Sequence, residues 1–163
     1  MDIRKAVTGD WEQILAIYQR ARDYMRQTGN PNQWQTSRPD PDTLAKNIAN
    51  RQLYVLEESG VLHGVFALIP GVDPTYNYIE GSWLNNEPYA AIHRVASAGL
   101  RTGVLGDCLS WCGSRYKNLR IDTHHDNRIM QHLLTKHGFT RCGIIYLENG
   151  EPRIAYHRIT KGC

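Results

Sequence analysis

Three glycines and Arg101 stand close together in the segment 99–106, where an apolar run gives way to a helical pattern. Gly103 and Gly106 fall in the first turn of the expected helix. A helix N-terminus carries unpaired N–H groups and a partial positive charge, so it can bind an anion. Glycines let a phosphate approach the backbone, and an arginine adds a charge-assisted hydrogen bond. The segment therefore predicts a pyrophosphate site, with a junction that needs glycine only for its turn as the alternative.

Three further side chains could move a proton. His93 lies in the apolar run 92–97, and an unperturbed imidazole pKa of about 6.5 suits a general base near neutral pH. Glu80 is a second candidate base, and Tyr146 is a candidate acid. Each has a structural alternative, because the imidazole could anchor a neighbouring loop, the carboxylate could be a solvated surface charge and the phenol could be packed.

His124 and His125 end an expected strand over residues 118–124. Successive side chains of a strand point to opposite faces. We therefore expect the two imidazoles to point apart, and we expect no metal site. The four cysteines contain no C-x-x-C pair, and Cys108 and Cys112 are expected to be buried as small apolar side chains.

A segment of about twenty residues from Pro70 to Ala90 has no clear periodicity and is rich in aromatic and acidic side chains. Structureless segments of this length in compact domains are usually lids or binding loops. Aromatic rings and carboxylates suit a pocket for a cationic or aromatic ligand. We expect Tyr78, Trp83 and, from an earlier loop, Trp34 to line a substrate pocket. Trp34 could equally fix its loop to the core.

The elements that must position these residues follow from periodicity, caps and turns. Helices are expected from a cap at Thr8 to about Gln27, from Asp40-Pro41 over a short stretch, from Gly103 onward, and from a cap at Asp126 to Gly138. Asn149-Gly150 is a strong hairpin signal. Strands are expected at 2–6, 52–57, 61–69, 92–97, 118–124, 142–148 and 152–159. This order predicts an α/β fold with a central mixed, mostly antiparallel sheet of about seven strands and helices on both faces.

The totals fit one domain over residues 1–163, with 41% hydrophobic and 21% charged residues. A net charge of +3 with scattered basic residues argues against nucleic acid as a partner. No apolar run approaches about 18 residues, and the first residues lack a signal-peptide core. We therefore expect a cytoplasmic protein without a membrane partner, and a homodimer remains an open possibility.

With the pyrophosphate-type turn after its fourth expected strand, the chain resembles the GCN5-related N-acetyltransferase (GNAT) superfamily. Its motif is Arg/Gln-x-x-Gly-x-Gly/Ala, and Arg101 and Gly106 match it, whereas Val104 stands in place of the first glycine. The resemblance implies a GNAT-like fold and acetyl-CoA as co-substrate. It also implies that the diphosphate of acetyl-CoA is bound by Arg101, Thr102, Gly103, Val104, Leu105 and Gly106.

Two other stretches are similar to family motifs. The strand 93–97 resembles the one whose backbone pairs with the pantetheine arm, which implies cofactor contacts at Val95, Ala96 and Ser97. Asn127, with the ending Lys136-His137-Gly138-Phe139, resembles the family motif whose asparagine reaches the cofactor. Leu134 departs from the pattern, because it occupies the place of the family's frequent tyrosine acid and cannot donate a proton.

The resemblance implies an acetyl-CoA-dependent N-acetyltransferase that acts on an amine of a small molecule or a peptide, by direct attack in a ternary complex. A backbone N–H near Val95 is placed for the developing oxyanion, and His93 is the first candidate base. Val104 and Leu134 support one alternative, an acyl-CoA-binding sensor with little or no transfer activity.

Overall fold

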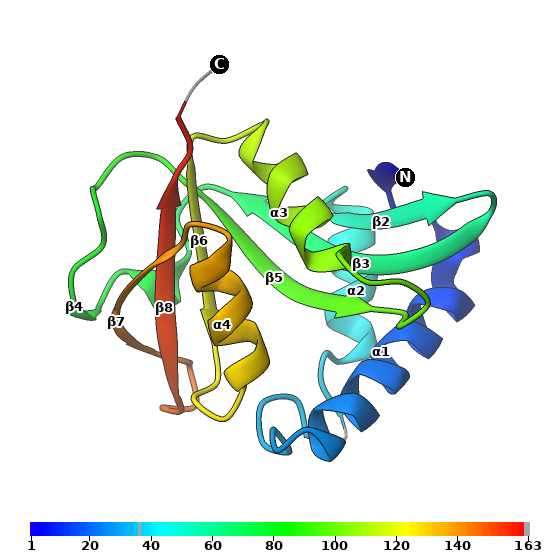
Figure 1. Cartoon of the computed structure of the whole chain (residues 1–163), viewed down its shortest axis with the longest axis horizontal. Coiled ribbons are helices and arrows are strands. Elements are labelled where there is room, and N and C mark those ends of the chain that lie inside the picture. The colour runs from blue at the N-terminus through cyan, green and yellow to red at the C-terminus, as the bar shows by residue number, and fades with distance from the viewer. Residues whose placement is uncertain (36, 162–163) are drawn as a thin grey trace.

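The computed structural model describes residues 1–35 and 37–161 (Figure 1). Cys163 lies outside the described residues. In chain order the elements are β1 (Asp2–Lys5), the 3-10 turn η1 (Thr8–Asp10), α1 (Trp11–Gln27), α2 (Pro41–Ala49), β2 (Leu53–Glu58), β3 (Val61–Pro70), the 3-10 turn η2 (Pro74–Tyr76), β4 (Glu80–Gly81), β5 (Ala90–Ser97), α3 (Val104–Gly113), β6 (Asn118–Thr123), α4 (Arg128–Lys136), β7 (Thr140–Tyr146) and β8 (Pro152–Ile159).

The strands form one sheet in the order β1-β2-β3-β5-β6-β8-β7-β4. Only β5 and β6 pair in parallel, and every other pairing in the described chain is antiparallel. The expected mixed, mostly antiparallel sheet is confirmed. The sheet has eight strands instead of about seven, because Glu80 and Gly81 form a two-residue edge strand on β7. Two residues are too few to show a period in the sequence.

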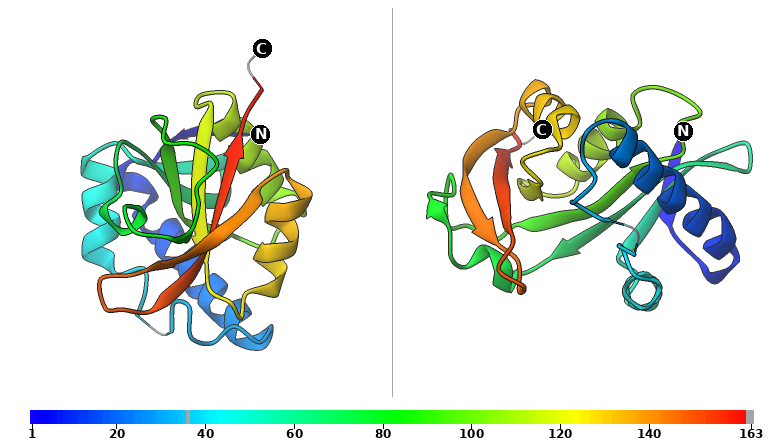
Figure 2. Two further views of the ribbon diagram at one scale, coloured as in Figure 1. Left: turned by 90° about the vertical axis from the view of Figure 1, so that its left-hand side faces the viewer. Right: turned by 90° about the horizontal axis from the view of Figure 1, so that it is seen from below.

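The helices cover both faces of the sheet, as expected (Figure 2). Helices α1 and α2 pack in one hydrophobic cluster with the inner strands, through buried side chains such as Ile14, Tyr18 and Leu44. Helices α3 and α4 pack in a second cluster that contains Leu134 and the buried Cys108 and Cys112. No helix in the described residues is long and apolar enough to cross a membrane.

Strands β5 and β6 are paired only at their starts, through Ala90 with Leu119 and Ala91 with Arg120. Beyond these pairs they diverge (Figure 1). The register between β3 and β5 shifts in the same region, and Arg94 has a φ of 56°. A β-bulge of this kind bends the strand that contains it. The edge of β5 that faces β6 is therefore left without a strand partner.

Two of the expected helix starts differ in the structure. Helix α1 begins at Trp11 after a 3-10 turn, and the Asp10 carboxylate accepts the Val7 N–H at 2.9 Å. Helix α4 is capped by Asn127, whose side-chain oxygen accepts the Met130 N–H at 3.0 Å, and not by Asp126. The corrections move the cap by two residues in α1 and by one residue in α4, at helix ends, where a sequence pattern is least informative.

The expected cap of α2 is confirmed, since the Asp40 carboxylate accepts the Asp42 N–H at 2.8 Å. The expected end of α4 is also confirmed, because Gly138 follows the helix with a φ of 85°. Gly64 allows a close approach, since a Cβ there would lie 2.6 Å from Cγ1 of Val104. That contact lets the start of α3 pack directly on β3.

Candidate active site

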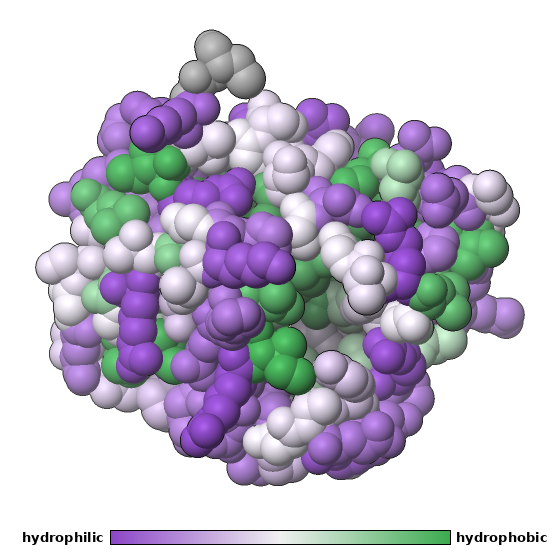
Figure 3. Space-filling view, viewed as in Figure 1, coloured by the Kyte–Doolittle hydropathy of each residue, from purple (hydrophilic) through white to green (hydrophobic). Residues whose placement is uncertain are grey.

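A cavity of about 200 Å³ lies where β5 and β6 diverge. Its walls come from these two strands, from the start of α4, from the segment between α1 and α2, and from the β7–β8 hairpin. Ile121 in the wall belongs to the cluster under α3 and α4, whereas Trp34 packs against the cluster under α1 and α2. The cavity thus reaches both faces of the sheet. Figure 3 shows a hollow with apolar walls beside α4.

His93 lies on β5 and lines the cavity. Its Nε2 atom is 2.9 Å from Oδ2 of Asp73. The other carboxylate oxygen of Asp73 accepts hydrogen bonds from the N–H and hydroxyl of Thr75, which fixes the carboxylate. When Nε2–H donates to Asp73, Nδ1 is the nitrogen with a free lone pair. The arrangement suits a general base and also anchors the start of η2.

Asp122 on β6 also lines the cavity, on the side of the sheet that carries His93. It accepts a hydrogen bond from the hydroxyl of Tyr76 at 2.6 Å. Tyr76 is fully buried, and burial raises the pKa of its phenol well above the usual value, with the Asp122 charge adding to the effect. Tyr76 therefore stays protonated and keeps its proton directed at Asp122.

Glu80 and Tyr146 lie together, away from the cavity lining. The Tyr146 hydroxyl donates to Oε1 of Glu80 at 2.8 Å, across the exposed edge formed by β4 and β7. Tyr78 is exposed beside them, with its ring centroid 6.4 Å from that of Tyr146. The geometry therefore gives no support to a catalytic role for Glu80 or Tyr146, or to an acceptor contact by Tyr78.

The two tryptophans expected in a substrate pocket have different surroundings. Trp34 lines the cavity and packs edge to face on Tyr18 at 5.6 Å, so it is both a pocket wall and a loop anchor. Trp83 donates its indole N–H to the Tyr76 carbonyl and stacks on the Arg120 guanidinium at 4.2 Å. It belongs to the packing beneath the 70–90 segment and is not among the residues that line the cavity.

The N-terminus of α3 has the features of an anion site. Gly103 precedes the helix with a φ of 82°, and no side chain among the described residues caps the first N–H groups. Those groups, on Val104, Leu105 and Gly106, are free for a phosphate. Arg101 lies beside them and pairs with Asp107 at 2.9 Å. The residues present therefore fit a diphosphate at this place.

Close packing between helices is a second reason for a glycine at position 106. A Cβ there would lie 2.9 Å from Cε1 of His137, on the segment that follows α4. Gly106 thus allows α3 and the end of α4 to pack closely. A substitution at this position would disturb packing as well as any phosphate, whereas a Cβ on Gly103 would meet nothing within 4 Å.

The other expected cofactor residues are distributed along the same cleft. Val95 and Asn127 line the cavity. Ala96 is buried, and the Ser97 hydroxyl accepts the Gly99 N–H at 3.1 Å in the turn that precedes α3. Asn127 donates to the Gln33 side chain at 2.9 Å while it caps α4. Its side-chain amide therefore already makes two hydrogen bonds within the protein.

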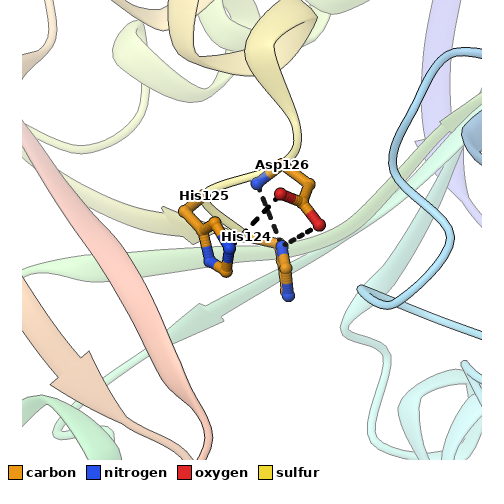
Figure 4. Close-up of side chains that lie close together, drawn as sticks. All are labelled: His124, His125 and Asp126. Carbon is orange, nitrogen blue, oxygen red and sulfur yellow. Dashed lines mark hydrogen bonds and ion pairs between the residues drawn. The ribbon is translucent and has the colours of Figure 1, made fainter.

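The expectation that His124 and His125 point apart is wrong. The strand ends at Thr123, so strand alternation does not apply, and the two rings stack with centroids 4.3 Å apart (Figure 4). Asp126 completes a group whose ligand atoms lie within 4.8 Å of one another. However, Nδ1 of His124 accepts the Asp126 backbone N–H at 3.0 Å. This nitrogen is therefore already used in the turn.

Sequence reasoning missed five charged residues near the cavity. Asp122, Arg94, Arg153 and Arg38 line it, and Asp73 orients His93. The available signals were Asp122 as an acidic residue inside a strand and the Asp73-Pro74 pair as a turn start. Leu134 is fully buried in the core, which agrees with its inability to act as an acid.

Several solved structures that are similar to this chain are named acetyltransferases. A GNAT-family acetyltransferase from Streptococcus agalactiae is 33% identical, with a TM-score of 0.86 over 98% of this chain and 95% of the other. A candidate acetyltransferase from Staphylococcus aureus is 22% identical, with a TM-score of 0.72 over 99% and 100% of the two chains. The protein yncA from Salmonella typhimurium, solved with its cofactor acetyl-CoA, is 17% identical, with a TM-score of 0.64 over 98% and 94%. No protein-family model and no curated protein matches the chain.

Proposed function

Because the chain belongs to the GNAT family of acetyltransferases, we propose that it transfers the acetyl group of acetyl-CoA to an amine of a small molecule or peptide. The amine attacks directly in a ternary complex. The observation that carries this proposal is the cavity between β5 and β6, which has His93 in its wall.

Three features of the chain would hold the co-substrate. The free N–H groups at the start of α3 would bind the diphosphate, and Arg101 would exchange part of its pairing with Asp107 for a phosphate. The unpaired edge of β5 beyond Ala91 would hydrogen-bond the pantetheine arm. When bound, acetyl-CoA supplies the acetyl group as an activated thioester.

His93 is the residue that we assign as general base. An alkylamine has a pKa of about 10.4 and is almost entirely protonated at pH 7. His93 takes this proton at Nδ1, which leaves the amine nitrogen with the lone pair that forms the new amide bond. Asp73 stabilises the resulting imidazolium through its hydrogen bond to Nε2.

Water is the donor that we assign to the departing thiolate. The carbon–sulfur bond breaks as the amide bond forms. The nitrogen then gives up its second proton, and water relays this proton to the thiolate. Leu134 cannot give it, Tyr146 lies on the exposed edge, and the Tyr76 proton is committed to Asp122. A thiolate is a good leaving group near pH 8 because thiols have a pKa of about 8.5.

The names of two structural neighbours bear on the reaction and on the acceptor. One structural neighbour from Brucella melitensis is named a ribosomal-protein-alanine N-acetyltransferase, and another is named for phosphinothricin. They are 19% identical to this chain. These names support N-acetylation as the reaction, and they show that one fold serves different acceptors.

Release of free thiol from acetyl-CoA, measured with a panel of amines, tests the proposal. We expect amine-dependent thiol release and acetyl-CoA binding by calorimetry. Gly103→Val should weaken that binding at least about tenfold, because the side chain strains the positive φ and blocks the N–H groups. Gly150→Val is the matched control, with a φ of 86° and nothing near its Cβ, at the tip of the β7–β8 hairpin.

Three results would overturn all or part of the proposal. If the protein does not bind acetyl-CoA at a millimolar concentration of acetyl-CoA, the whole proposal is wrong. Binding without thiol release for any amine would favour the acyl-CoA sensor instead. Equal affinity in the two glycine variants would remove the role of the α3 N-terminus.

A further inference from the structure

Arg94 is a charged residue in the cavity wall without a counter-charge in contact. Its Nη1 atom is buried and has no hydrogen-bond partner among the described residues. Its guanidinium also forms no ion pair with any described residue. A half-buried cation without a partner is costly, and an arginine keeps its charge. Such a group in a cavity wall is suited to an anionic ligand.

The acidic residues closest to Arg94 are already engaged. Asp73, Asp122 and Asp40 are the carboxylates that act on its pKa, which burial lowers and these charges raise. Asp73 is bound to His93 and Thr75, Asp122 accepts the Tyr76 hydroxyl, and Asp40 caps α2. None of them forms an ion pair with Arg94. The positive charge thus remains available to a molecule in the cavity.

Arg153 in the same wall behaves differently. It is bound to the Glu151 carboxylate at 3.2 Å and donates to the carbonyls of Pro152 and Gln33. Its hydrogen bonds fix the β7–β8 hairpin against the segment before α2. Of the three arginines that line the cavity, Arg38 is exposed and Arg153 is paired, and Arg94 is the half-buried one whose guanidinium has no such partners in the described chain.

The position of Arg94 is fixed by the bulge in β5. Its φ of 56° breaks the strand alternation, and its carbonyl accepts the Tyr18 hydroxyl at 2.7 Å. A bulge re-aims a side chain, and this one does so directly beside the assigned base. Arg94 and His93 are neighbours in sequence and both line the cavity. An anion on Arg94 and an amine at His93 would therefore be only a few bonds apart in one small molecule.

We propose that Arg94 binds a carboxylate of the acceptor, so that the substrate is a small amine of the amino-acid type. This inference rests on the proposed acetyl transfer for the role of the amine. A guanidinium binds a carboxylate through paired, charge-assisted hydrogen bonds. The cavity of about 200 Å³ is smaller than the ~300–1,000 Å³ of drug-sized ligand sites, so it suits a compact acceptor.

The test compares matched pairs of acceptors that differ only in the carboxylate. L-leucine is paired with 3-methylbutylamine, L-phenylalanine with 2-phenylethylamine, and the other natural amino acids with their decarboxylated amines. Binding to the CoA-saturated protein is measured by calorimetry, and kcat/KM is measured by thiol release. For at least one pair we expect the carboxylate to improve binding and kcat/KM at least about tenfold.

Arg94→Gln should remove this preference while acetyl-CoA affinity is unchanged. Arg94→Lys, which keeps the charge, should restore part of it and guards against a folding defect in the first variant. Arg26→Gln is the matched control, because it removes the same charge from the exposed face of α1, where Arg26 pairs with Asp23. It should keep the full preference.

The outcomes separate this inference from the proposed function. Equal or better use of the amines without a carboxylate, or no binding by any amino acid, would overturn the inference and leave acetyl transfer intact. A fall in acetyl-CoA affinity with an unchanged acceptor preference in Arg94→Gln would place Arg94 on the co-substrate and overturn the inference too. Absence of acetyl-CoA binding in the unsubstituted protein would instead refute the proposed function.

Discussion

The described residues contain two hydrogen bonds from a tyrosine to a carboxylate, and they lie in opposite environments. Tyr76 donates to Asp122 at 2.6 Å beneath the cavity, and Tyr146 donates to Glu80 at 2.8 Å on the outer edge of the sheet. The exposed fraction is 1% for Tyr76 and 36% for Tyr146. By residue type alone the two pairs are equivalent.

The difference between the pairs shows that the chemistry of a tyrosine–carboxylate pair depends on its burial and not on the residue types alone. Beneath the cavity, burial removes competing water, so hydrogen bonds to a carboxylate are strong and the groups are held in one geometry. At the edge, water competes for both partners and the pair contributes little. The segment 70–90 supplies members of both pairs. Of its four aromatic side chains, Tyr76, Trp83 and Tyr89 pack in one hydrophobic cluster, and Tyr78 is exposed.

The largest expected difference is in kcat, between a variant that lacks the cavity base and a variant that lacks the edge carboxylate. His93→Ala should lower kcat on the order of 100-fold at pH 7, because positioned bases contribute roughly 10²–10⁴-fold. The deficit should shrink as the pH rises toward the pKa of the amine, since free amine then forms without a base. Glu80→Ala should leave kcat unchanged. A pH–rate profile for His93→Ala that parallels the unsubstituted protein would rule His93 out.

A second experiment removes the two phenolic hydroxyls. Tyr76→Phe should lower the free energy of unfolding by about 1.5–3 kcal/mol, the usual range for a buried hydrogen bond to a charged group. Tyr146→Phe should show no measurable change, because water replaces the lost bond. Denaturant titration measures both variants. Equal losses in the two variants would mean that burial does not distinguish the pairs.

The smallest expected effect concerns acid stability. Burial raises the pKa of Asp73, but hydrogen bonds from His93 and Thr75 outweigh it and bring the pKa down to about 2. In the unfolded chain the pKa of an aspartate is about 3.9. The unfolded state thus binds more protons in this range, so the contribution of Asp73 is present above about pH 4 and is lost toward pH 2.

Asp73→Asn removes this titration. The variant should be less stable than the unsubstituted protein at pH 7, and the gap should narrow between about pH 4 and pH 2. Glu80→Gln, which removes a carboxylate from the exposed edge, should follow the unsubstituted protein throughout. Thermal unfolding at a series of pH values measures all three. A constant gap for Asp73→Asn would show that its ionisation is not linked to folding.

Local signals in the sequence determined most of the fold. Asp40 with Pro41, Gly138 after α4 and Asn149-Gly150 in the last hairpin specify backbone conformations by their own chemistry. The apolar periodicities then give the strands and helices that these signals separate. Gly103 is another local signal. A glycine readily adopts the positive φ found there, and it has no side chain that could cap the helix start. Such features depend on few distant contacts, so a single sequence reveals them.

The cavity was decided only by the tertiary structure. His93 meets Asp73 across 20 positions of the chain, and Asp122 meets Tyr76 across 46. Arg94 becomes an unpaired cation only because the nearby carboxylates are bound elsewhere. The same folding moves Glu80 and Tyr146 to an exposed edge and stacks His124 on His125 after the strand has ended. Distance, burial and competition for partners between remote residues arise when the sheet assembles, and residue type and spacing do not encode them locally.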